Sequence, residues 1–110
     1  MYIDNEFENK WKALLTELSS SYGEELDMQA VIFIIGLQEL NKNHRKYTKD
    51  QKIDIMHIAI CSLLSKYGYY EFVGRDEEGW PHFNATDKLP HLKPGQQLRL
   101  MKEAIMEYFS

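Results

Sequence analysis

The sequence predicts a mainly α-helical single domain, with four helices and one β-hairpin between the third and the fourth. Four segments carry apolar residues at helical spacing. One further stretch, "YYEFVGRDEEGWPHF" at 69–83, alternates in polarity on both sides of an acidic, glycine-containing turn, as hairpins do. The chain has 110 residues, a length typical of one domain with its own core.

The first helix is predicted over residues 4–22. Phe7, Trp11 and Leu18 share one helical stripe with Leu14 and Leu15. Asp4 is a typical N-cap, and Gly23 ends the helix.

The second helix is predicted over residues 27–43 and is expected to be the central, buried one. Its middle, "MQAVIFIIGLQEL" at 28–40, is apolar nearly all round. The β-branched residues would also suit a strand, but the flanking Met, Gln, Ala, Glu and Leu favour a helix. Four helices of this size would not cover so much apolar surface, so a homodimer is predicted.

The third helix is predicted over residues 49–67 and the fourth over 95–109. Thr48 and Gln51 form a capping box at the start of the third, and Gly68 is placed as its C′ residue. Pro94 suits the first turn of the fourth. The predicted apolar stripes are Ile53, Met56, Ile60, Leu63, Leu64 and Tyr67 in the third helix, and Leu98, Met101, Ile105 and Tyr108 in the fourth.

The hairpin is predicted over residues 69–86, with 76–79 as its loop and Arg75 opposite Trp80. That register puts Tyr70, Phe72, Phe83 and Ala85 on an inner, core-facing side. The outer side then carries Tyr69, Glu71, Val73, Arg75, Trp80, His82 and Asn84. Arg75 is expected to stack on Trp80.

The function predicted from these features is that of a non-enzymatic, self-associating protein-interaction module that binds through the outer side of its hairpin. The candidate protein-binding residues are Tyr69, Arg75, Trp80 and His82, since aromatic residues and arginine dominate interface energetics. An alternative, in which Trp80 only folds over the edge of the hairpin, stays open.

Composition narrows the other classes of function. The net charge of −4 argues against a general affinity for nucleic acid or anionic membranes. The longest apolar run is too short to span a bilayer, and the acidic N-terminus is unlike a signal peptide. The single cysteine, Cys61, predicts a reducing, cytoplasmic location. No cofactor is predicted.

A nucleic-acid-binding alternative rests on one basic corner, which holds Lys42, Arg45, Lys46, Lys49 and Lys52. Helix, basic turn, helix and hairpin follow one another as in a winged helix. The wing tip would be the acidic 76–78 segment, which phosphates would repel.

Two constellations would suit a small enzyme or a metal protein. Glu71 and His82, as diagonal neighbours on the hairpin, could act as an acid–base pair. His57 and Cys61 lie one turn apart on the third helix, with Asp54 one turn earlier. A solvated ion pair and a buried cysteine are the commoner readings of these patterns, so no metal site is predicted.

The segments "KDQKIDIMHIAI" (49–60) and "GRDEEGWPHF" (74–83) resemble small, uncharacterised bacterial proteins of about this length. The resemblance covers most of the chain. It implies a bacterial, cytosolic origin and no particular activity, and it assigns no site residue.

Overall fold

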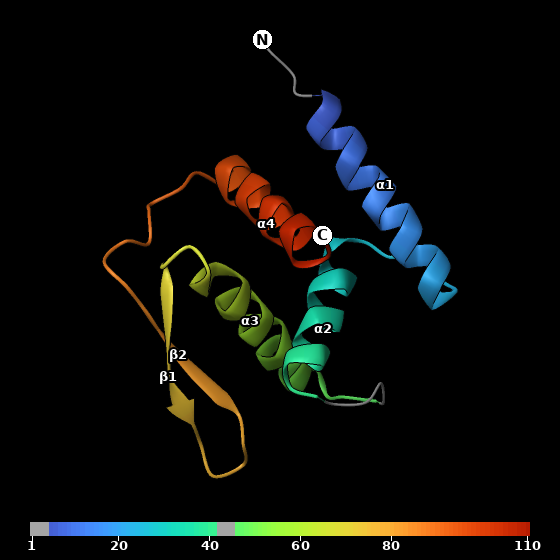
Figure 1. Cartoon of the computed structure of the whole chain (residues 1–110). Coiled ribbons are helices and arrows are strands. Elements are labelled where there is room, and N and C mark those ends of the chain that lie inside the picture. Colours follow the sequence, from blue (N-terminus) through green and yellow to red (C-terminus); the bar gives the residue numbers. More distant parts are fainter. Residues whose placement is uncertain (1–4, 42–45) are drawn as a thin grey trace.

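Four helices and one β-hairpin follow one another in the predicted order (Figure 1). The structure, a computed structural model, describes residues 5–41 and 46–110. Its elements are α1 (Asn5–Tyr22), α2 (Met28–Glu39), α3 (Lys49–Ser65), β1 (Tyr70–Arg75), β2 (Pro81–Ala85) and α4 (Pro94–Tyr108). The predicted fold class is therefore confirmed. No helix in the described parts of the chain is both long and apolar enough to cross a bilayer.

The central segment forms a helix throughout. Asp27 caps α2 by accepting a hydrogen bond from the Ala30 backbone N–H at 2.8 Å. The helix stops at Glu39, short of the predicted residue 43, because Asn41 adopts a positive φ of 53° that breaks the helical path. Residues 42–45 lie outside the described part of the chain.

The monomer itself covers most of the apolar surface of α2. Val31, Ile32, Ile34, Ile35 and Leu37 are all buried. The sequence-based reason for a dimer, a surplus of uncovered apolar surface on this helix, therefore does not hold. Burial of these side chains instead supplies the main hydrophobic stabilisation within one chain.

The helices α2 and α3 cross closely at Gly36. A Cβ atom on Gly36 would lie 2.6 Å from Cγ2 of Ile55 and still closer to the Ile55 carbonyl oxygen. Only glycine allows this approach. The crossing separates two clusters in the core: a large one that joins α1, α2, α3 and α4, and a small one formed by Leu37, Tyr47 and Ile55.

Both predicted caps of α3 are confirmed, although the helix ends at Ser65 and not at the predicted residue 67. The Thr48 hydroxyl accepts from the Gln51 backbone N–H at 3.1 Å, and the Gln51 side chain accepts from the Thr48 N–H at 2.9 Å. At the other end, Gly68 has a φ of +79°, and the Tyr69 N–H donates to the Leu64 carbonyl at 3.2 Å. This is the Schellman arrangement that a C′ glycine permits.

The apolar stripes of α3 and α4 differ in part from the prediction. On α3 the buried side chains are Ile55, Ile58, Ala59, Cys61, Leu63 and Leu64, whereas Ile53 is 54% exposed. On α4, Ala104 and Ile105 are buried while Leu98 is exposed. Both exposed residues lie in the N-terminal part of their helix, and on α3 the predicted stripe also omitted the buried Ile55, Ile58, Ala59 and Cys61.

The helix α4 lies between α3 and α1, and α1 packs along its outer side (Figure 1). The Lys102 ammonium group lies 3.2 Å from the Glu8 carboxylate, and the Arg99 guanidinium lies 4.0 Å above the Phe7 ring. At its far end, α4 is joined to the turn that follows α3 by the Tyr67 hydroxyl, which donates to Glu107 at 3.0 Å. Burial and this carboxylate raise the pKa of Tyr67 to about 12.

The two strands pair in antiparallel fashion with a bulge that the sequence-based register lacks. Phe72 pairs with Phe83, as predicted, but Gly74 pairs with His82, and Val73 is the extra residue. Arg75 therefore lies opposite Pro81 and not opposite Trp80. Because side chains alternate along a strand, the bulge moves Arg75 to the same face as Phe72.

Candidate functional site

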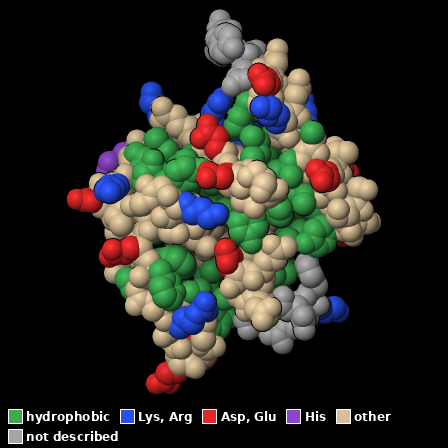
Figure 2. Space-filling model, viewed as in Figure 1, with side chains coloured by type: hydrophobic (Ala, Val, Ile, Leu, Met, Phe, Trp, Pro, Cys, Tyr) green, Lys and Arg blue, Asp and Glu red, His purple; other side chains and the backbone are tan. Residues whose placement is uncertain are grey.

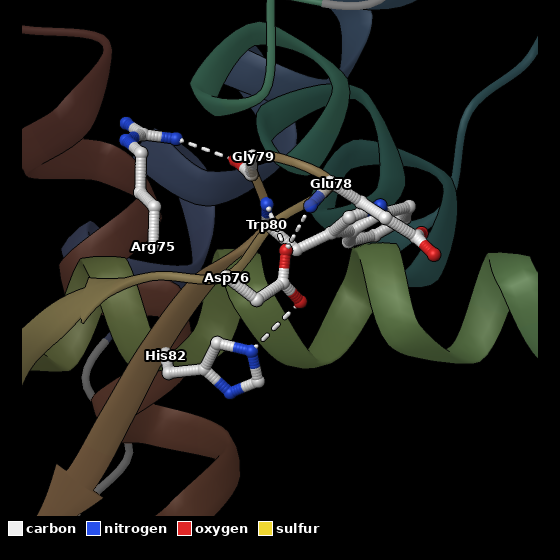
Figure 3. Close-up of polar contacts among 6 residues, drawn as sticks. All are labelled: Arg75, Asp76, Glu78, Gly79, Trp80 and His82. Atoms are coloured by element: carbon white, nitrogen blue, oxygen red, sulfur yellow. Dashed lines mark hydrogen bonds and ion pairs between the residues drawn. The ribbon is translucent and has the colours of Figure 1, made fainter.

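The hairpin turn is organised by one carboxylate, that of Asp76 (Figure 3). Its Oδ1 atom accepts hydrogen bonds from the backbone N–H groups of Glu78 and Trp80, each at 2.9 Å. Its Oδ2 atom lies 3.0 Å from Nε2 of His82. Gly79 completes the turn with a φ of +86°, in the left-handed conformation predicted for it.

These contacts also favour the ionised form of the Asp76 carboxyl group. The hydrogen bond from His82, followed by that from the Trp80 amide, holds the pKa of Asp76 below its ordinary value. Asp76 therefore stays ionised at any physiological pH. The Arg75 guanidinium points away from this carboxylate and donates to the Gly79 carbonyl at 3.0 Å (Figure 3).

The Trp80 side chain belongs to the small core cluster and does not lie on an outer face. It is half-buried and packs against Leu37, Tyr47 and Ile55. The sequence-based assignment of Trp80 to the outer side of the hairpin was therefore wrong. Instead, the indole anchors the turn to α2 and α3.

The opposite correction applies to Phe72, which was predicted to be core. Phe72 is 54% exposed and the bulged Val73 is 53% exposed. Phe83 is half-buried, with its ring centroid 5.7 Å from that of Phe72 in an edge-on arrangement. The Arg75 guanidinium lies 5.9 Å above the Phe72 ring. We call Phe72, Val73, Arg75 and Phe83 the aromatic patch.

The space-filling view shows hydrophobic side chains gathered over the hairpin at the lower left, with a basic side chain beside them (Figure 2). Large apolar side chains are normally exposed singly. Here two consecutive ones are more than half exposed and a third adjoins them. The aromatic patch is thus a contiguous, largely exposed apolar surface on the hairpin.

A second feature lies between the turn and the first half of α3. It is a cleft of about 420 Å³, which we call the turn cleft. From α3 it is lined by Gln51, Asp54, His57 and Ile58, and from the hairpin by Asp76, Glu78, Trp80, Pro81 and His82. Its volume lies in the range typical of small-ligand sites.

The four candidate protein-binding residues do not share one face. Trp80 and His82 line the turn cleft, whereas Arg75 belongs to the aromatic patch. Tyr69 is half-buried, stacks on Tyr67 with ring centroids 5.7 Å apart, and packs against the large core cluster. The predicted single outer surface is therefore replaced by two separate surfaces.

The enzyme and metal alternatives gain little from the geometry. The structure pairs His82 with Asp76, and Glu71 lies opposite Asn84. Sγ of Cys61 lies 3.5 Å from Nε2 of His57, but burial raises the pKa of the Cys61 thiol and so disfavours the thiolate that a metal needs. No group of three or more His, Cys, Asp or Glu within residues 5–41 and 46–110 is arranged to hold a metal ion.

The basic corner is only partly described. Lys46, Lys49 and Lys52 are exposed on the loop before α3 and on its first turn. Lys42 and Arg45 lie outside the described residues. The tip of the hairpin carries Asp76, Glu77 and Glu78, all exposed, so a wing at this position would present negative charge to a phosphate backbone.

Sequence reasoning missed two roles that the structure makes clear. Asp76 appeared only as part of an acidic turn, although an aspartate that opens a tight turn commonly accepts from amides two residues on. Glu78 was noted only as part of the acidic tip and Gln51 only in the capping box, because their meeting in one cleft depends on how the turn packs on α3. Asp54 was noted only beside the possible metal ligands His57 and Cys61.

Comparison of the chain with protein-family models, with curated proteins and with solved structures finds no match.

Proposed function

We propose that this protein is a non-enzymatic protein-interaction module that binds its partner, a second copy or another protein, through the hairpin. The observation that carries the proposal is the exposure of Phe72 and Val73 on β1, 54% and 53% respectively. Aromatic residues and arginine are enriched at the energetic centres of protein interfaces.

The packing of the turn supports the same proposal. Trp80 packs the turn on the small core cluster. The Asp76 carboxylate holds the turn through the backbone N–H groups of Glu78 and Trp80 and through the His82 ring. The aromatic patch therefore sits on a hairpin whose turn is already held in one conformation. A prearranged surface loses less conformational entropy when it binds. A single buried cysteine also suits a reducing cytoplasm, where we place the module.

The proposal is tested with two variants matched in exposure. Phe72→Ser removes the centre of the aromatic patch, and Ile53→Ser removes an equally exposed apolar side chain on α3, since both residues are 54% exposed. Wild type and both variants are immobilised, and the proteins that each retains from extract of the native cell are quantified. Any protein that depends on Phe72 is then purified and titrated.

Self-association is measured on the same three proteins by sedimentation velocity at micromolar concentration. We expect Phe72→Ser to lose a specific partner, or the dimer, while Ile53→Ser keeps it. If no protein is retained in a Phe72-dependent way and the wild type sediments as a 13.0 kDa monomer throughout, the proposal fails.

A further inference from the structure

We infer that the turn cleft is the pocket that receives an arginine side chain of the protein partner. This inference rests on the proposed function, because it assigns the chemistry of the partner at one place on the hairpin. It comes from the composition of the cleft walls, which combine carboxylates from two elements with an indole.

Carboxylates from two elements line the cleft, together with the imidazoles of His57 and His82. Asp54 contributes a carboxylate from α3, while Asp76 and Glu78 contribute carboxylates from the turn, and none of the nine described residues that line the cleft is Lys or Arg. The nearest turn cation, Arg75, donates to the Gly79 carbonyl and lies over the Phe72 ring on the other side of the turn. Within the hairpin, Nε2 of His82 lies 3.0 Å from Oδ2 of Asp76, so Asp54 and Glu78 supply the carboxylates that a ligand in the cleft would meet.

The other walls favour a guanidinium over a compact ammonium. The Trp80 indole forms one wall and Ile58 contributes another apolar surface. A guanidinium is planar and weakly hydrated, and it can stack on an aromatic ring while its N–H groups donate to carboxylates. Oε1 of Gln51 already accepts from the Thr48 N–H, and its second lone pair can accept a further hydrogen bond.

The cleft also has the right extent and position for a side chain that arrives from a bound partner. A volume of about 420 Å³ holds a long side chain together with ordered water. The hairpin turn is shared between the cleft and the aromatic patch, since Arg75 belongs to the patch and the next residue, Asp76, lines the cleft. One partner segment could therefore contact both.

The test uses the full chain, labelled with ¹⁵N, and titrates it with the capped peptide acetyl-Gly-Arg-Gly-amide. Binding is followed through the amide signals of Glu78 and Trp80 and through the Trp80 indole N–H signal. The same peptide with citrulline in place of arginine keeps the shape and removes the charge. Butylguanidine provides the guanidinium and its alkyl chain without a peptide and without a second charge.

Three variants locate the binding. Asp54→Asn and Glu78→Gln each neutralise one wall of the cleft, whereas Glu77→Gln changes the net charge equally on the same turn but outside the cleft lining. We expect the arginine peptide to bind about tenfold more tightly than the citrulline peptide, as the loss of a charge-assisted hydrogen bond predicts. We expect Asp54→Asn and Glu78→Gln each to weaken it several-fold and Glu77→Gln to leave it unchanged.

The inference is overturned if the citrulline peptide binds as well as the arginine peptide, or if Glu77→Gln weakens binding as much as Glu78→Gln. Tighter binding of butylguanidine than of the peptide would overturn it too, because the cleft would then be a small-molecule site. Failure here is separable from failure of the proposed function. The Phe72-dependent partner would still be retained if only the cleft assignment were wrong, and it would be absent if the module itself did not bind proteins.

Discussion

Replacing Gly36 with alanine tests the crossing of α2 and α3 on which the hairpin rests. The added Cβ would lie 2.6 Å from Cγ2 and 3.0 Å from the carbonyl carbon of Ile55. Carbon atoms normally pack about 3.5–4.0 Å apart, so the helices must separate by roughly 1 Å. Ile55 cannot move aside by a rotamer change, because its backbone is among the atoms in the way.

Overpacking of this kind typically costs about 1–3 kcal/mol, and a backbone clash belongs at the upper end of that range. Alanine returns up to about 1 kcal/mol because it favours the helix more than glycine does. The net loss in the free energy of unfolding should therefore be about 2 kcal/mol or more. For a domain of this size, such a loss lowers the melting temperature by roughly 10 °C.

The matched control is Gly95→Ala at the start of α4, where an added Cβ would meet no atom within 4 Å. This variant should be neutral, or more stable by up to about 1 kcal/mol. Urea denaturation followed by far-UV circular dichroism gives both values. If Gly36→Ala is as stable as Gly95→Ala, the close crossing of the two helices is not present in solution.

Three further predictions concern the hairpin, the end of α3 and the basic corner. Trp80→Ala should lower the free energy of unfolding by about 2–3 kcal/mol, because the half-buried indole packs on the small core cluster, whereas Phe72→Ala should lower it by about 1 kcal/mol or less. If urea melts show the larger loss for Phe72→Ala, the two faces of the hairpin are exchanged. Burial, followed by the hydrogen bond to Glu107, raises the pKa of Tyr67 to about 12 in the folded state, so the neutral hydroxyl contributes stability that is fully present below the unfolded value of about 10 and is lost as the pH rises towards 12. Tyr67→Phe should remove this part of the pH dependence of the urea midpoint, and identical pH profiles for the wild type and the variant would refute it. Nucleic acid should bind weakly and without sequence preference in mobility-shift assays, and a sequence-preferring shift abolished by Arg45→Ala plus Lys49→Ala would favour the winged-helix alternative instead.

Local chemistry made much of the fold predictable. The capping box of Thr48 and Gln51 and the C′ position of Gly68 depend on residues close together in sequence, and both caps of α3 match the prediction. The α2 segment was harder because its β-branched residues suit a strand. Its flanks and its length decided correctly for a helix.

The hairpin register shows where local reasoning failed. An isolated glycine inside a strand pattern is a signal for a bulge. Gly74, with a φ of 133°, lies directly after the bulged residue of β1. The predicted register ignored that signal, and a shift of one residue moved Arg75 to the face of Phe72. The predicted stacking of Arg75 on Trp80 was lost with it.

The candidate site was less predictable than the fold, because both surfaces depend on tertiary packing. Nothing near Trp80 in sequence indicates that it would pack on Leu37, far away on α2. The turn cleft exists only because the turn lies over α3, which brings Glu78 and Asp54 to the same cavity. Alternation of polarity along a strand can identify two faces, but it does not say which face the helices will cover.

The most direct measurement of the central claim places a photo-crosslinking amino acid, p-benzoylphenylalanine, at position 72 in the native cell and, in a parallel strain, at position 53. Both positions are 54% exposed, so random collisions should label them alike. The proposed function predicts a discrete adduct from position 72 alone, at twice the 13.0 kDa mass of the chain for a dimer or at another defined mass for a different partner. The same adducts from both positions, or none from position 72, would contradict the claim that the hairpin is a protein-binding surface.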